Sequence, residues 1–163
     1  MLYSQVLATG GFVPVNAIAN SYFDYLVEDA DEWIRSRTGI RERRFASATE
    51  STSDLATSAA KDALQKGKID PLSIDCIIVA TSTPDMILPT ACMVQKNIGA
   101  ANAFAFDMNA VCSSFIYAVE TADNFIRSGK YGKVLVIGAD TYSKILDMQD
   151  KTSCPLFGDG AGA

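Results

Sequence analysis

The sequence contains no histidine, so it lacks the side chain that most often serves as a general base or metal ligand near neutral pH. The four cysteines are widely spaced and form no Cys-x-x-Cys pair, so neither a zinc site nor any other metal site is expected. No run of about 18 apolar residues is present, and no segment is predicted to span a membrane. Because the first residues also lack the basic start of a signal peptide, we expect a cytoplasmic protein without disulfides.

Charged residues are few as well, and the net charge of the chain is slightly negative. Charged residues make up 20% of the chain and the net charge is −5, which predicts neither disorder nor a general affinity for nucleic acid. With 163 residues and 48% hydrophobic content, the chain can bury one substantial core, and one domain is expected. Basic residues nevertheless gather between Arg35 and Arg44. This segment could meet phosphate, or it could form ion pairs with Glu32 and Glu42.

Apolar runs alternate with helical stretches, which predicts an α/β fold with a mostly parallel, buried central sheet and helices on both faces. Residues 74–82 and 133–140 are β-branched runs that read as fully buried central strands. Residues 101–109 alternate more loosely and predict a third strand that could face a partner chain. The chain ends on small residues where a strand would be expected to continue, and we interpret it as a piece of a longer protein.

Helix signals separate these strands. Ser51 or Thr52 can cap a helix that runs to about residue 66 and ends at Gly67, and a short helix is expected after Pro89. A third helix starts after residue 112 and stops at Gly129. Four of its apolar residues share one face: Phe115, Val119, Ala122 and Ile126.

Cys112 lies where the predicted strand 101–109 turns into the third helix. Peptide dipoles and free N–H groups at a helix start stabilise a thiolate, so a cysteine placed there is a candidate nucleophile. Its small neighbours would let a substrate carbonyl approach the backbone: Ala110, Ser113 and Ser114. The alternative is that Cys112 only packs between strand and helix. Cys76, inside a predicted strand, is interpreted in that second way, and so is Cys92.

A second candidate site surrounds Trp33. Trp33 and Ile34 could simply belong to the apolar stripe of an amphipathic helix. Alternatively, the aromatic plane together with the guanidinium of Arg37, the hydroxyl of Thr38 and the flexible Gly39 suits a nucleotide with phosphates, through stacking and charge-assisted hydrogen bonds.

Taken in order, the motifs resemble β-ketoacyl-acyl carrier protein synthase III, a family of condensing enzymes with the thiolase fold. The motifs are GxxxP from Gly10 to Pro14, DEWI from Asp31 to Ile34, RTGIRERR from Arg37 to Arg44, AVCSSF around Cys112, and FGDGAGA from Phe157 to Ala163. The resemblance covers essentially all of residues 1–163 and implies an N-terminal thiolase-like half, with the C-terminal half absent.

The resemblance implies an acyltransferase that initiates fatty-acid synthesis. Such an enzyme moves a short acyl group from acyl-CoA to a cysteine and condenses it with malonyl-acyl carrier protein, with loss of carbon dioxide. Both compounds are substrates, and no further cofactor is implied. Carried over by motif, Cys112 is the acylated nucleophile, while coenzyme A would contact Trp33, Arg37, Thr38 and Lys151.

The resemblance also implies acyl carrier protein and a second copy of the chain as partners. Leu88 would reach across the homodimer to line the partner's acyl pocket, and Phe157 would lie near the site. Ser113 and Ser114 stand where the family often has alanine and glycine, and Lys151 where it often has arginine. These departures bear on pocket shape and on the geometry of ligand contact.

Condensation in the family also needs a histidine and an asparagine from a second half, so residues 1–163 alone are predicted to be inactive. Three alternatives remain open at this stage. They are a non-catalytic thiolase-like subunit or binding fragment, a starter-unit acyltransferase of polyketide or secondary metabolism, and a cysteine hydrolase, which would also need a base from elsewhere.

Overall fold

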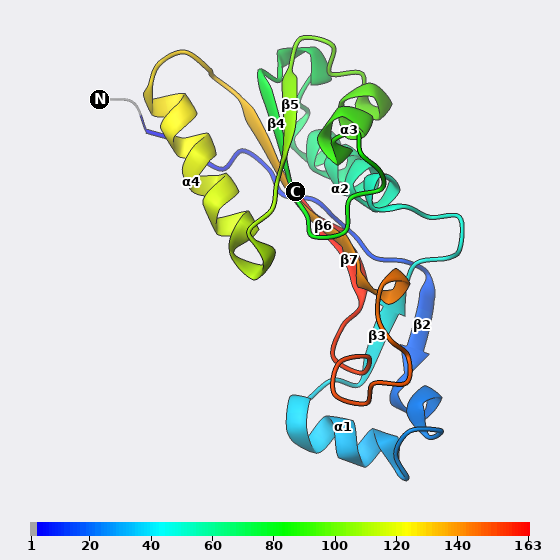
Figure 1. Ribbon diagram of the computed structural model, residues 1–163. Coiled ribbons are helices and arrows are strands. Elements are labelled where there is room, and N and C mark those ends of the chain that lie inside the picture. Colours follow the sequence, from blue (N-terminus) through cyan, green and yellow to red (C-terminus); the bar gives the residue numbers. More distant parts are fainter. Residues whose placement is uncertain (1–2) are drawn as a thin grey trace.

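The central sheet of the computed structural model, which describes residues 3–163, has five strands in the order β1-β7-β6-β4-β5 (Figure 1). Three neighbours are parallel: β4 (Cys76–Ala80), β5 (Phe104–Met108) and β6 (Val134–Thr141). At the other edge, β7 (Asp159–Gly162) and β1 (Gly11–Phe12) add antiparallel pairs. The three predicted strands and the parallel arrangement at the centre of the sheet are thus confirmed.

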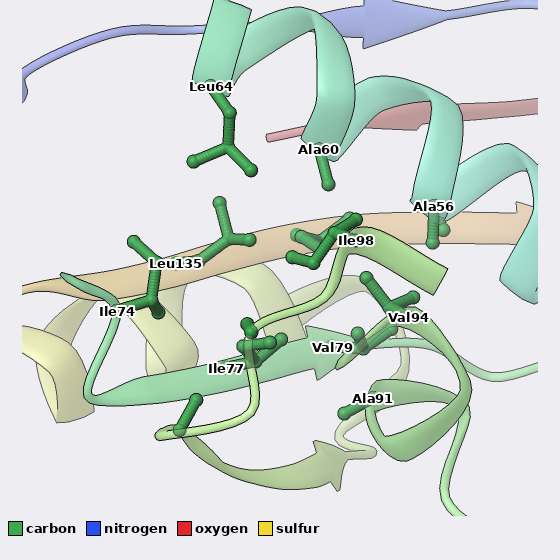
Figure 2. Packing of buried hydrophobic residues seen from close by; sticks show 14 residues of the cluster. Ala56, Ala60, Leu64, Ile74, Ile77, Val79, Ala91, Val94, Ile98 and Leu135 are labelled. Atoms are coloured by element: carbon green, nitrogen blue, oxygen red, sulfur yellow. The ribbon is translucent and has the colours of Figure 1, made fainter. Parts of the chain in front are cut away.

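Helices cover both faces of this sheet, as the sequence predicts. On one face, α2 (Thr52–Gly67) and α3 (Thr90–Ile98) pack on β4 and β6, and Figure 2 shows the apolar side chains that meet there. On the other face, α4 (Ser114–Arg127) packs on β4. None of the helices within the described residues is long and apolar enough to cross a bilayer.

The strand β4 is buried along its whole length because successive side chains point to opposite faces and both faces are covered. Ile77 and Val79 join the α2–α3 cluster, whereas Ile78 packs toward α4. The same expectation for β6 is wrong in part. Leu135 and Ile137 are buried, but alternate residues of β6 remain half-buried, because α4 leaves part of that face open.

The ends of α2 follow local chemistry. Ser51 accepts a hydrogen bond from the backbone N–H of Asp54, and the Asp54 carboxylate accepts one from the N–H of Ser51, which completes a capping box. The helix includes Gly67, and the left-handed residue that ends it is Lys68, one position later than predicted. Gly10 lies directly against α2, where a Cβ would clash with the backbone atoms of Ala59 and Ala63.

The four apolar residues predicted on one face of α4 do share a face, but only Ala122 among them is buried. Ser114, Ala118 and Ala122 are the buried residues of α4, whereas Phe115 and Val119 are 42% and 46% exposed. Phe115, Val119, Ala122 and Ile126 instead line an open apolar cavity of about 450 Å³ beside residues 4–9.

A second cluster, absent from the sequence predictions, lies beyond the end of the sheet (Figure 1). It is built from α1 (Ala30–Thr38) and a two-stranded sheet of β2 (Asn16–Ala19) and β3 (Glu42–Phe45). Its buried residues are Phe23, Ala30, Ile34, Phe45 and Cys154, and we call them the α1 cluster. Short 3-10 turns complete the elements: η1 (Asn20–Phe23), η2 (Pro71–Ser73), η3 (Val111–Ser113) and η4 (Tyr142–Lys144).

Candidate active site

Cys112 lies in the turn η3 between β5 and α4, at the junction that the sequence predicts. Its side chain is exposed, and it lines a cavity of about 340 Å³. The cavity lies at the carboxyl ends of β4 and β6, which is where parallel sheets usually bind ligands. Cys112 is therefore neither inside a strand nor packed away between strand and helix.

Sequence reasoning missed most of the residues that line this cavity. They come from β6, β7, η4 and the first turn of α4, and include Gly138, Asp140, Tyr142, Gly160 and Phe115. Gly138 packs closely against the Phe115 ring, since a Cβ there would lie 3.2 Å from the ring, which would have to shift by a few tenths of an ångström.

A buried network of hydroxyls and one carboxylate forms the wall behind the cavity. Asp140 accepts hydrogen bonds from the Thr81 hydroxyl (3.1 Å), the Ser82 N–H (2.8 Å) and the Thr83 hydroxyl (2.9 Å). The Thr52 hydroxyl, at the start of α2, donates to the Thr83 carbonyl at 2.6 Å. The loop after β4 is thereby tied to both β6 and α2, which makes this wall of the cavity rigid.

Asp159 ties the glycine-rich segment 157–163 to neighbouring segments of the chain in a similar way. Its buried carboxylate accepts hydrogen bonds from the Ala46 N–H (2.6 Å) and the Ser143 N–H (2.8 Å), and also from the Ser143 hydroxyl. The neighbouring Tyr142 ring stacks on the Phe157 ring with centroids 4.9 Å apart. Tyr142 lines the cavity, and the Phe157 ring packs directly behind Tyr142.

The four cysteines differ sharply in accessibility. Burial, with a smaller contribution from Asp75, raises the pKa of the Cys76 thiol to about 12. Burial likewise raises the pKa of Cys154, which lies in the α1 cluster. Cys92 is exposed on α3, contrary to its interpretation as a packed residue. Cys112 combines exposure with a position on the cavity at the strand ends.

The residues proposed for nucleotide contact lie together on α1. The Arg37 guanidinium lies 4.6 Å from the centroid of the Trp33 ring and donates a hydrogen bond to the Trp33 carbonyl at 3.1 Å. The Thr38 hydroxyl donates to the Ile34 carbonyl (2.8 Å) and accepts from the Ile40 N–H (3.1 Å), which ends the helix. The Trp33 indole is half-buried against the α1 cluster, in agreement with its interpretation as part of an apolar helix stripe, and its contact with a nucleotide stays a prediction.

The loop that carries Lys151 is anchored on the same cluster. Met148 and Cys154 pack with the buried residues beneath Trp33, and the Tyr25 hydroxyl donates to the Met148 carbonyl at 2.6 Å. Lys151 is exposed at the outer side of this loop. The α1 helix and the Lys151 loop, more than 100 residues apart in sequence, therefore form one surface (Figure 1).

The basic residues of segment 35–44 have different environments: some make buried or paired contacts, and others stay exposed. Arg43 is buried, Arg44 pairs with Glu42 at 2.8 Å, and Arg35 pairs with Asp31 at 3.2 Å. The expected ion pair with Glu42 is present, whereas the acidic partner on α1 is Asp31 and not Glu32. Arg37 stays on the exposed surface beside Trp33.

Leu88 does not line the cavity of its own chain. It belongs to an exposed apolar loop with Met86 and Ile87. The exposed fractions are 72% for Met86, 104% for Ile87 and 59% for Leu88. The structure therefore groups Trp33, Arg37 and the Lys151 loop in one place and Cys112 in another, and leaves Leu88 on the surface.

Comparison with known proteins places this architecture in a family. A sequence profile described as 3-oxoacyl-(acyl-carrier-protein) synthase III matches residues 106–163. The synthase III of Aquifex aeolicus VF5 is 47% identical with a TM-score of 0.93, over 97% of this chain and 51% of that chain. The enzyme of Thermus thermophilus is 44% identical with a TM-score of 0.91, over 98% and 50%.

A third similar structure is the priming β-ketosynthase of the R1128 polyketide pathway, which is 34% identical with a TM-score of 0.94, over 98% of this chain and 48% of that chain. This chain thus spans about half the length of the structures it matches. The identity, the near-complete coverage of residues 1–163 and the thiolase-like fold agree with one another, and the chain belongs to the 3-oxoacyl-(acyl-carrier-protein) synthase III family.

Proposed function

We propose that this chain is the nucleophile-bearing half of an initiating condensing enzyme, which transfers a short acyl group from acyl-CoA to Cys112 and then to malonyl-acyl carrier protein. The observation that carries the proposal is the exposed thiol of Cys112 in a turn that opens onto a cavity at the strand ends. The family relationship supports the same chemistry, because the matched structures are named as synthases and a priming ketosynthase.

In the first step, the Cys112 thiolate attacks the thioester carbonyl of acyl-CoA. The bond from the carbonyl carbon to the coenzyme A sulfur breaks, a new bond to the Cys112 sulfur forms, and coenzyme A leaves as a thiolate that takes up a proton. In the second step, malonyl-acyl carrier protein loses carbon dioxide, and the resulting carbanion attacks the acyl group and releases Cys112. We assign the groups that promote this second step to a second half of the protein, since residues 1–163 contain no histidine.

We propose that coenzyme A binds across α1 and the Lys151 loop. The Trp33 ring offers a stacking surface for adenine, on the face where the Arg37 guanidinium now lies at 4.6 Å. Arg37 and Lys151 would then contact phosphates, and the Thr38 hydroxyl keeps one lone pair for a donor on the nucleotide. The exposure of Arg37 and Lys151 supports this assignment.

We further propose that two copies of the chain pair through β5. This strand forms an edge of the sheet and carries Phe104, which is 39% exposed. The neighbouring loop with Leu88 is apolar and exposed, as expected of a segment that enters a partner's acyl pocket. The free thiols of all four cysteines support a reducing compartment, and we place the protein in the cytoplasm.

A second candidate is starter-unit transfer in polyketide synthesis, because the R1128 priming ketosynthase matches at 34% identity. The two candidates share Cys112 and differ in the acyl group that fits beside Phe115 and Tyr142. A non-catalytic binding subunit is the remaining rival.

The test supplies the full-length protein with a series of acyl-CoA compounds and malonyl-acyl carrier protein, and detects the ketoacyl product by mass spectrometry. We expect product from the full-length protein, none from its Cys112→Ala variant, and none from residues 1–163 alone. Preference for acetyl-CoA would favour fatty-acid synthesis, and preference for a longer or branched starter would favour the polyketide role. Product from the Cys112→Ala variant would overturn the proposal.

A further inference from the structure

The residue before Cys112 has an unusual backbone conformation. Val111 has a φ of +53°, in the left-handed region, although it is neither glycine nor asparagine. A β-branched side chain is especially unfavourable there, because its Cβ substituents crowd the backbone. Such a conformation persists only where surrounding contacts hold it, and it is common at functional turns.

Two side chains hold this turn from either end. The Ser114 hydroxyl accepts a hydrogen bond from the Ala110 N–H at 2.6 Å and donates one to the Val111 carbonyl at 2.7 Å. The Asn109 side-chain oxygen accepts from the Val111 N–H at 3.2 Å. Ser114 is only 3% exposed, so its hydroxyl is fixed between the two backbone groups that flank the strained residue.

We infer that Ser114 is a positioning residue for Cys112, because its hydroxyl fixes the left-handed Val111 and so directs the thiol into the cavity. That the position of Cys112 affects catalysis rests on the proposed acyl transfer. The hydrogen bonds that Ser114 makes in the turn do not depend on that proposal. A residue without a side-chain hydroxyl at position 114 could make neither of these two hydrogen bonds.

The direction of the effect follows from the geometry of the turn. Cys112 follows Val111 directly, so any relaxation of φ at Val111 rotates the peptide that carries the Cys112 backbone. Without the Ser114 hydroxyl, the Ala110 N–H loses its partner and the Val111 carbonyl keeps only the hydrogen bond from the Ser114 backbone N–H, so a relaxed turn becomes more favourable. Misplacement of a nucleophile by about 1 Å can lower a rate by roughly a hundredfold.

The experiment measures two reactions of Cys112 in the full-length protein: acylation by acetyl-CoA, and alkylation by iodoacetamide followed by peptide mapping. Ser114→Ala should lower the acylation rate by about tenfold or more at unchanged KM, and should slow alkylation at Cys112. Ser128→Ala is the matched control, because the exposed Ser128 hydroxyl donates to the Phe125 carbonyl at the other end of α4, and it should leave both rates within about twofold.

The decisive variant is Val111→Gly combined with Ser114→Ala. Glycine adopts a positive φ without strain, so it should restore most of both rates if Ser114 acts by holding the left-handed turn. It should also restore the fold if Ser114→Ala alone proves unstable. Wild-type rates in Ser114→Ala, or no rescue by Val111→Gly, would overturn the inference. If acetyl-CoA does not acylate the wild-type protein, the proposed function is wrong. The alkylation rates of Cys112 in the variants still decide whether Ser114 positions this residue.

Discussion

Replacement of Arg43 by methionine tests how the segments that form the α1 cluster are held to one another. Arg43 is 6% exposed and donates hydrogen bonds to the Pro155 carbonyl (3.2 Å), the Ile18 carbonyl (3.2 Å) and the Asn20 side-chain oxygen (2.6 Å). Its guanidinium also lies 4.8 Å from the Phe23 ring. Burial lowers the pKa of Arg43, and the three acceptors compensate for the water that the charged group has lost.

The expected loss of stability follows from these contacts. Methionine preserves most of the packed volume but leaves three acceptors without their donor, and each hydrogen bond from a charged donor contributes roughly 1.5–3 kcal/mol. Removal of the charge also relieves its desolvation cost, which offsets part of the loss. We therefore expect Arg43→Met to lower the free energy of unfolding by about 3 kcal/mol.

The assay is urea unfolding followed by the fluorescence of Trp33, the single tryptophan, which packs on the same cluster. Arg44→Met is the matched control. Arg44 makes a partly exposed ion pair with Glu42, and its loss should cost less than about 1 kcal/mol. Equal losses in the two variants would refute the account of Arg43 as the residue that joins β3 to the Lys151 loop.

Two further perturbations test the core and the acid response. Ile78→Ala, in the buried strand β4, should lower the free energy of unfolding by about 3 kcal/mol in urea, and a loss no larger than that of the exposed Ile116→Ala would contradict this packing. Hydrogen bonds from the N–H groups of Lys133 and Gly132 lower the pKa of Asp75 below 3.8, so its contribution to stability is present above that pH and is lost as pH falls through the lower folded pKa. Asp75→Asn should therefore reduce the loss of thermal stability on acidification below about pH 4, and an unchanged pH dependence would contradict the assignment.

Features set by local sequence were predictable. The β-branched run at 76–80 has no polar face, so it fits only a strand covered on both sides. Ser51 and Asp54 form their capping box within four residues, and Cys112 follows β5 closely enough for the turn into α4 to be foreseen. Each of these inferences needs only neighbouring residues.

Features set by distant contacts were not predictable. Asp140 is held at the cavity wall by a hydrogen bond from the Thr81 hydroxyl, 59 residues earlier in the sequence. No local sequence pattern predicts that contact. Arg43 looked like one more surface cation, yet its acceptors at Ile18 and Pro155 come from segments that only the fold brings together. The shared apolar face of α4 was predicted, but apolar periodicity does not reveal that most of this face stays uncovered.

The left-handed Val111 shows a further limit. Valine strongly favours an extended backbone, so a valine at position 111 does not predict the positive φ observed there. The hydroxyl of Ser114 could have provided a hint, since serine at a helix start commonly bonds to nearby backbone groups. That hint indicates a cap in general and does not identify the residue whose conformation is being held.

The most direct test of the account is peptide mapping of the four cysteines of residues 1–163 after the full-length protein has been exposed to acetyl-CoA. We expect one acetyl group, bound as a thioester that hydroxylamine removes, at Cys112 alone. Cys76 and Cys154 are buried, and the exposed Cys92 serves as the internal control for nonspecific acylation. Acetyl groups shared between Cys92 and Cys112, or none at Cys112, would contradict the assignment of Cys112 as the acyl acceptor.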